Sequence, residues 1–132
     1  MNNAKWFDRK FDFQNESQDI PVIYQRLKET PPQLRKHVSS LSSEQLRYKP
    51  GGKWSVIEHC GHLFILEQLW QTRIIDIIRG QPILTAADLD NRATTEGRFN
   101  TMNIDNVLND FENARKITLR QLDLLSPNDL VK

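Results

Sequence analysis

Apolar residues recur at steps of three, four or seven positions in three long segments of this chain, and no other feature constrains the fold as much. Such spacing places apolar side chains on one stripe of an α-helix, whereas a half-buried strand alternates at every second residue. The three segments span about 19–41, 55–79 and 103–125. No alternating pattern typical of a strand occurs elsewhere. The sequence therefore predicts an all-α fold, an up-and-down helix bundle with three long helices.

In the first segment, Pro31 and Pro32 interrupt the helical pattern. Proline inside a helix removes one backbone hydrogen bond and usually bends the helix. Because the apolar stripe keeps its phase across both prolines, we expect one kinked helix instead of two separate ones. A short helical turn over 42–46 and a glycine-containing connector over 49–53 should follow it.

The second segment has clear signals at both ends. Ser55 and Glu58 form the Ser-x-x-Glu pattern of a capping box, which predicts where the helix begins. Gly80 suits the left-handed position after a helix, and Pro82 prevents the helix from continuing. Apolar residues occupy several faces of this helix, which indicates that protein surrounds it.

The connection over 81–102 is long and rich in Asp, Asn, Thr and Arg. We expect one helical turn at 86–89, within a connection that wraps the bundle or serves its function. The first sixteen residues have no lasting period, and we expect this tail to pack its aromatic side chains across the bundle. These side chains are Trp6, Phe7, Phe11 and Phe13.

Composition excludes several classes of protein. The chain has 132 residues, which fits a single domain over 1–132. Its 18 basic residues nearly balance 17 acidic ones, so charge does not support nucleic-acid binding. No run of about 18 apolar residues predicts a membrane-spanning helix, and the first residues lack the apolar core of a signal peptide. The lone cysteine, Cys60, excludes an internal disulfide framework, so we expect a cytoplasmic protein.

Two of the chain's three histidines lie on the apolar second helix and are the main candidates for chemistry. His62 has two interpretations: a neutral imidazole that binds a metal, or a core histidine hydrogen-bonded to a backbone carbonyl or water. His59 has no acidic or cysteine partner at ligand spacing, so packing is the favoured interpretation. On the same helix, Glu67 and Trp70 are expected to mark the inner lining and a core anchor.

The other polar candidates have simpler explanations. Capping accounts for Glu58, and a free cysteine in an apolar helix, such as Cys60, is usually a small buried hydrophobe. His37, near the end of the first helix, is expected in solvent. Three residues of the long connection either rim a pocket or belong to a solvated loop, which is the favoured interpretation: Asp88, Asn91 and Arg92.

The first and third segments end in a similar way. Both ends follow the pattern Leu-Ser-x-(acidic or amide)-x-Leu, over 41–46 and over 125–130. The first motif leads to the second helix, whereas only two residues follow the second motif. Since up-and-down bundles commonly have four helices, we expect a bundle that lacks its fourth helix and leaves an apolar groove in its place.

Four motifs of the chain resemble a known family. They are Lys-Trp-Phe-Asp-Arg-Lys-Phe at 5–11, Pro-Gly-Gly-Lys-Trp-Ser-Val-Ile-Glu-His-Cys-Gly-His-Leu at 50–63, Leu-Glu-Gln-Leu-Trp at 66–70 and Ala-Asp-Leu-Asp-Asn-Arg at 87–92. The block Trp-Ser-x-x-Glu-x-x-Gly-His-Leu is the most specific. In these motifs the chain resembles the DinB-like (YfiT-like) four-helix-bundle superfamily, whose name records induction by DNA damage in bacteria.

This resemblance implies a metal site. In the family, a histidine early in the second helix joins a His-x-x-x-His pair of the fourth helix around a divalent metal, zinc or nickel. Characterised relatives use the metal to activate a low-molecular-weight thiol in transferase or isomerase reactions. His62 matches the first of these ligands. The His-x-x-x-His pair has no counterpart in this sequence, so His62 is the one expected metal ligand and catalytic residues stay unassigned.

Two functions therefore stay open. The first is a metal-dependent, thiol-using transferase or hydrolase that acts on a small electrophile, with a metal site that this chain leaves incomplete. The second is a non-catalytic bundle that works through homodimerisation or partner binding, in which a second copy covers the apolar groove. A third interpretation is an incomplete gene product without a function of its own.

Overall fold

The structure is a computed structural model, and it describes residues 20–125. The elements in chain order are α1 (Ile20–Val38), α2 (Ser43–Arg47), the 3-10 turn η3 (Pro50–Gly52), α3 (Val56–Ile78), α4 (Arg92–Glu96), the 3-10 turn η4 (Phe99–Thr101) and α5 (Ile104–Asp123). Every regular element in this range is helical, so the predicted all-α class is confirmed. The aromatic tail and residues 126–130 of the second Leu-Ser motif lie outside the described residues.

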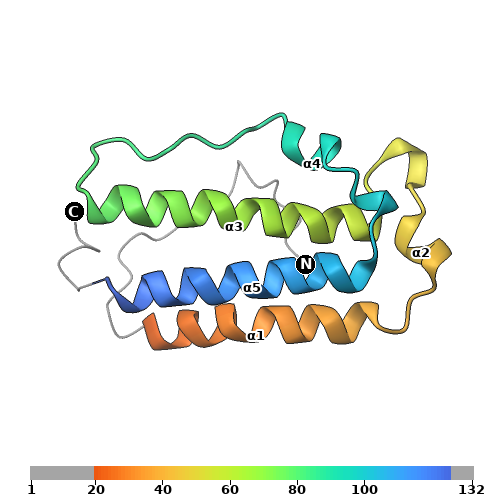
Figure 1. Cartoon of the computed structure of the whole chain (residues 1–132), viewed down its shortest axis with the longest axis horizontal. Helices are drawn as coiled ribbons and strands as arrows, with labels where there is room; N and C mark the ends of the chain where they lie inside the picture. The colour runs from red at the N-terminus through yellow and green to blue at the C-terminus, as the bar shows by residue number, and fades with distance from the viewer. Residues whose placement is uncertain (1–19, 126–132) are drawn as a thin grey trace, which may run out of the picture.

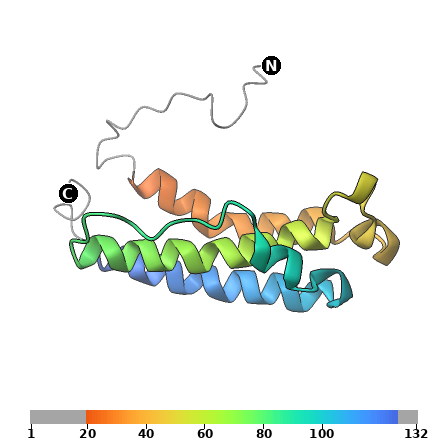
Figure 2. The same cartoon turned by 90° about the horizontal axis from the view of Figure 1, so that it is seen from above.

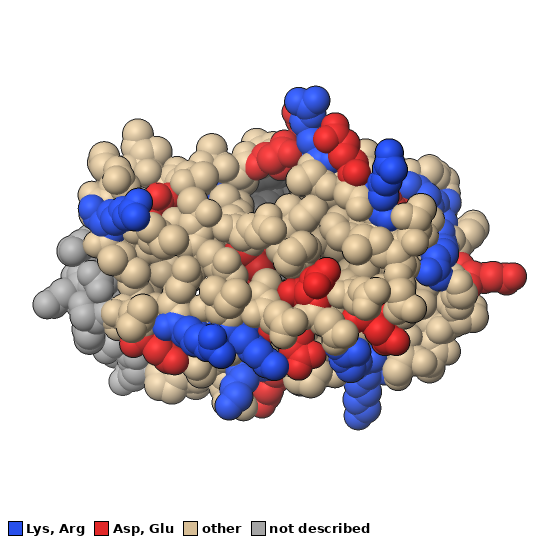
Figure 3. Space-filling view, viewed as in Figure 1, with Lys and Arg blue, Asp and Glu red and all other residues tan. Residues whose placement is uncertain are grey.

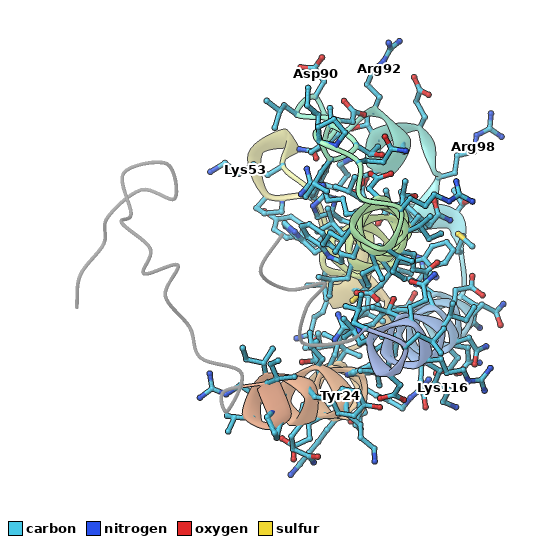
Figure 4. The ribbon with its side chains drawn as sticks, turned by 90° about the vertical axis from the view of Figure 1, so that its left-hand side faces the viewer. Tyr24, Lys53, Asp90, Arg92, Arg98 and Lys116 are labelled. Carbon is cyan, nitrogen blue, oxygen red and sulfur yellow. The ribbon has the colours of Figure 1, made fainter. Side chains whose placement is uncertain are left out.

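The three long helices form an open layer in which α5 lies between α1 and α3 (Figure 1). Seen end on, α3 lies above α5 and α1 lies to one side below it, so α1 and α3 each pack on α5 (Figure 4). We call residues 81–91 the strap. It returns the chain along α3, so α3 and α5 run in the same direction, antiparallel to α1 (Figures 1 and 2).

The predicted signals at the ends of α3 are confirmed. The Oγ atom of Ser55 accepts a hydrogen bond from the Glu58 backbone N–H at 3.3 Å, and Glu58 Oε1 accepts one from the Ser55 N–H at 3.0 Å. Gly80 follows the helix with a φ of 68°, a region in which glycine has no steric penalty. These local interactions fix where α3 begins and ends.

The main hydrophobic core lies where α2 and η4 meet the long helices. Its buried residues are Val38, Leu46, Ile57, Cys60, Phe99, Val107 and Leu108. Arg47 and Asn100 join this end of the bundle, because each donates a side-chain hydrogen bond to the other's backbone carbonyl at 3.1 Å. The hydroxyl of Ser55 lies 2.6 Å from Asn100 Oδ1, so the same network holds the start of α3.

As predicted, α1 continues through both prolines, although Pro31 has no N–H to donate to the carbonyl of Leu27. Arg115 of α5 replaces this donor, because its Nη1 donates to Leu27 O at 2.8 Å. Its Nη2 donates to Glu67 Oε1 of α3 at 2.7 Å. One guanidinium group therefore binds both of the other long helices.

Glu67 is 1% exposed, and both of its carboxylate oxygens have partners. Oε1 accepts from Arg115, and Oε2 accepts from the hydroxyl of Thr118 at 2.6 Å. A buried carboxylate requires such pairing, because it loses its hydration on folding. The prediction that Glu67 lies on the inner lining is confirmed.

The strap differs from the prediction in one respect. Residues 86–89 are not helical, and the first helical turn after α3 is α4. Asp88 explains the difference, since its carboxylate accepts hydrogen bonds from the backbone N–H groups of Asp90 at 3.1 Å and Arg92 at 2.8 Å. An aspartate that bonds to the backbone after it favours a turn over a continuing helix.

The surface carries charges of both signs. On the face shown in Figure 3, basic and acidic side chains are interspersed, and acidic groups are also visible near the centre. This distribution agrees with the near-zero net charge and gives that face no basic stripe for nucleic acid. None of the helices in residues 20–125 has the length and apolar content that a bilayer-crossing segment requires.

We expect Arg115→Met to lower the free energy of unfolding by about 3–5 kcal/mol, because it leaves the Glu67 carboxylate buried without its charged partner. The double variant Glu67→Leu/Arg115→Met should recover part of this loss, since it buries no charge. Urea denaturation of the wild type, both single variants and the double variant measures the coupling. A double variant as unstable as the sum of the two singles would contradict it.

Candidate functional site

His62 lies early in α3, on the side that faces α4. Its Nδ1 is hydrogen-bonded to the hydroxyl of Thr94 in α4 at 2.9 Å, and Thr94 is 1% exposed. The indole ring of Trp54 packs against the imidazole, with ring centroids 4.9 Å apart. These contacts orient the ring and leave Nε2 as the nitrogen without a hydrogen-bond partner among residues 20–125.

Two effects favour the neutral form of His62. Burial lowers the pKa of His62 below its ordinary value of 6.5, and His59 lowers it further because two imidazolium ions repel each other. A neutral imidazole can offer a lone pair to a metal or accept a proton. When that lone pair is on Nε2, Nδ1 carries the hydrogen and donates it to Thr94 Oγ1.

A pocket of about 850 Å³ opens beside His62, between α3 and the strap. Figure 3 shows it as a recess between these two elements. Its lining is mainly apolar and includes Leu66, Leu69, Trp70, Ala87 and Ala93. This pocket places His62 and Thr94 at the edge of a space that can hold a small molecule.

Trp70 is not the core anchor that the sequence predicted. It projects from α3 on the side of the strap instead of α5, and it is 39% exposed at the pocket. The guanidinium group of Arg73 lies over its ring, 5.4 Å from the ring centroid. This cation–π contact covers an indole that the core does not bury.

Gly61 determines how closely the chain after α4 approaches α3. A Cβ atom at this position would lie 2.3 Å from Cγ of Phe99, which is itself buried. Only glycine permits such an approach. The contact seats η4 against α3 and so supports the position of the preceding turn, α4, which carries Thr94.

The other two histidines do not complete a site with His62. His59 is exposed and contacts the edge of Trp54, with centroids 5.3 Å apart. His37 is exposed in the last turn of α1, which packs on α5. Within residues 20–125, no three His, Cys, Asp or Glu side chains gather as a group that could hold a metal.

Glu58 and Cys60 have structural roles. Burial alone raises the pKa of Glu58, but hydrogen bonds from Ser55 and the ammonium group of Lys49 outweigh it and hold the pKa below its ordinary value. Cys60 is 2% exposed, and burial raises the pKa of its thiol. A raised pKa disfavours the thiolate that a nucleophile requires.

The polar residues of the strap fall into two groups. Asp88 and Asn91 belong to the lining of the pocket, and Asp88 is also exposed, so both interpretations of the connection apply to it. Arg92 and Asp90 point away from the helices into solvent (Figure 4). The sequence gives no signal for Thr94, because α4 is only five residues long and shows no apolar period.

The donor atoms fit only part of a metal centre. A zinc site usually has three or four protein ligands. The sequence contains three histidines, and of these His62 is the one that lines the pocket between α3 and the strap. Residues 20–125 therefore provide one imidazole suited to be a ligand and the hydroxyl that orients it, and they do not provide a closed metal site.

Comparison with known proteins gives one match. The sequence model of a family described as the DinB superfamily matches residues 26–131, which include His62, the strap and α5. No curated protein and no solved structure matches the chain.

We expect His62 to make the fold less stable as the pH falls. Its pKa is lower in the folded chain than the ordinary 6.5, so the unfolded chain binds the proton more readily. The stability associated with neutral His62 is present above about pH 6.5 and is lost as the pH falls through the folded-state pKa. His62→Gln should flatten this loss, and the exposed control His37→Gln should not. Denaturation between about pH 7.5 and pH 5 measures both slopes, and equal slopes for wild type and His62→Gln would count against this role.

Proposed function

Since the chain belongs to the DinB superfamily, we propose that it is a metal-dependent member in which His62 binds zinc or nickel. The reaction we propose is thiol-dependent, a transferase or hydrolase reaction on a small electrophile. We also retain a cytoplasmic location and a single domain as predictions.

The hydrogen bond between His62 Nδ1 and Thr94 Oγ1 is the observation that supports this proposal best. Histidines that bind metals usually donate their second ring N–H to an oxygen acceptor, which fixes the tautomer and the orientation of the ring. Thr94 is buried and can supply that acceptor, so Nε2 of His62 is the nitrogen that would bind the metal. The lowered pKa of His62 favours the same neutral form.

The remaining metal ligands must be residues or molecules other than those that contact His62, which are Trp54 and Thr94. A second imidazole from this chain could only be His37 or His59, because the sequence has no other histidine. Carboxylates, a thiol or a second polypeptide are the alternatives. A divalent metal in such a site lowers the pKa of a bound thiol, and this chain's part would be to hold one ligand and shelter the adjoining pocket.

Binding of zinc alone should depend on His62. We expect a stoichiometric complex for the wild type, loss of that complex for His62→Ala, and retention for His59→Ala. Thr94→Val should weaken binding by about 10–100-fold, because it removes the acceptor that orients the imidazole. Isothermal titration calorimetry with zinc and with nickel measures these affinities. Equal binding by wild type and His62→Ala would exclude His62 as a ligand.

A second function, homodimerisation without catalysis, is favoured by a different observation. A groove of about 660 Å³ lies between the start of α1 and the end of α5, and its lining includes Ile23, Leu27, Leu122 and Leu125. Ile23 is 45% exposed among the described residues. We propose that a second copy of the chain covers this groove if the protein works by association.

The dimer should respond to a charge placed in this groove. We expect Ile23→Glu to shift the protein toward monomer, since a buried carboxylate without a partner opposes association. Gln33→Glu, at an exposed position of the same helix, is the control and should leave the dimer intact. Light scattering coupled to size exclusion measures the mass of each variant. A wild type that is monomeric at micromolar concentration would rule out this second function.

A further inference from the structure

We propose that the pocket under the strap binds an uncharged, largely apolar small molecule, which directs one hydrogen-bonding group toward His62. Assigning this molecule as the substrate rests on the proposed function, whereas the binding itself requires no metal.

The strap is anchored to α3 near its first residues. The Thr85 backbone N–H and hydroxyl donate to Asp76 Oδ2 at 2.8 Å and 2.7 Å, and Arg73 Nε donates to Thr85 O at 2.9 Å. At its other end the strap leads into α4, which the bond between Thr94 and His62 ties to α3. Anchors at both ends hold the segment between them over α3 as the roof of the pocket.

Small side chains keep the pocket open. Ala86 and Ala87 of the strap and Ala93 of α4 all belong to its lining, opposite Leu66 and Leu69 of α3. Larger side chains at these positions would fill the space, as they do in a packed core. The resulting volume, about 850 Å³, falls within the range of about 300–1,000 Å³ that is typical of ligand pockets.

The charges in the lining favour an uncharged ligand. The described residues that line the pocket include no lysine or arginine, and Asp88 is the one carboxylate among them. That carboxylate already accepts two backbone hydrogen bonds. An anionic ligand would lose hydration here without gaining a partner of opposite charge, and a cation would have to share the one carboxylate with the backbone groups that it already binds.

Polar groups at the end of the pocket near α4 give the ligand an orientation. Nε2 of His62, the hydroxyl of Thr94 and the amide of Asn91 all belong to residues of the lining. A hydroxyl, carbonyl or amide group on the ligand can form a hydrogen bond there, while its apolar body contacts the alanines and leucines. Pockets of this composition bind through apolar contact and use a few polar groups for specificity.

The test uses N-phenyl-1-naphthylamine, an uncharged aromatic probe with one N–H group. We expect saturable binding with energy transfer from Trp70, which Trp70→Phe should reduce. Ala87→Phe and Ala93→Leu should each weaken binding by about tenfold or more, because they fill the pocket. Thr95→Leu is the matched control, since Thr95 is an exposed residue of α4 outside the lining, and it should change affinity by less than about threefold.

A charged analogue tests the ligand class. Anilinonaphthalene sulfonate has similar rings and an added sulfonate, and we expect it to bind at least about tenfold more weakly at this site. Circular dichroism shows whether each variant is folded, and Ala87→Val tests the same wall with less added volume. Unchanged probe affinity in folded filling variants, or equal binding of the sulfonate, would overturn the proposal.

One further variant separates this inference from the proposed function. His62→Ala should lose zinc binding and weaken binding of the uncharged probe by only about two- to tenfold, because one hydrogen-bonding group is lost while the apolar walls remain. If the wild type binds the probe but no zinc, the pocket proposal is supported and the proposal of metal binding is refuted. If the wild type binds zinc and the filling variants bind the probe as tightly as the wild type does, the pocket proposal is refuted and the metal proposal is not.

Discussion

Arg115 of α5 donates hydrogen bonds to both of the other long helices, α1 and α3. One bond goes to the carbonyl of Leu27, which has no helical donor because Pro31 follows four residues later. The other goes to the buried carboxylate of Glu67. Apolar residues of similar size could stabilise such a layer as well as a buried ion pair does. What the guanidinium adds is geometry, since its planar donors satisfy both partners only when all three helices are in register.

This register also determines the direction in which His62 points. Each residue of an α-helix turns by about 100°, so two residues five positions apart lie about 140° apart around the axis. Because Glu67 faces Arg115 on α5, His62 faces away from α5, toward α4. Gly61 then lets Phe99 approach α3 at van der Waals distance, which supports α4 beside the histidine. The ion pair and the candidate site are thus two consequences of one rotation of α3.

Local sequence signals predicted the ends of the helices well, but they did not predict which distant residues the helices contact. Ser55, Glu58 and Gly80 gave the ends of α3 within one residue, because capping depends only on the residues beside it. The Arg115 bond to Leu27 joins positions 88 apart, and no local pattern reports such a contact. The available signal was a charged residue, Arg115, on the otherwise apolar stripe of α5, together with Glu67 of opposite charge on the apolar helix α3.

The candidate site was predictable to the same extent. His62 was identified by its motif, but Thr94 lies 32 positions away on a single helical turn without apolar period. Trp70 was assigned to the core because large aromatic residues on apolar helices are usually buried. The sequence could not show that Trp70 lies on the face of α3 beside the strap. Tertiary packing decides which side of an apolar helix becomes a pocket.

The parallel arrangement of α3 and α5 has a consequence for how the chain folds. Two adjacent helices joined by a tight turn can dock as soon as both form, whereas here the chain must first travel back along α3. The contact of Arg115 with Glu67 closes a loop between positions 48 apart, and the contact of Arg115 with Leu27 closes one between positions 88 apart. Contacts of such separation bear a larger loop-closure entropy and slow folding. We infer that the capped helix α3 forms early and that the pocket beneath the strap is among the last features to assemble.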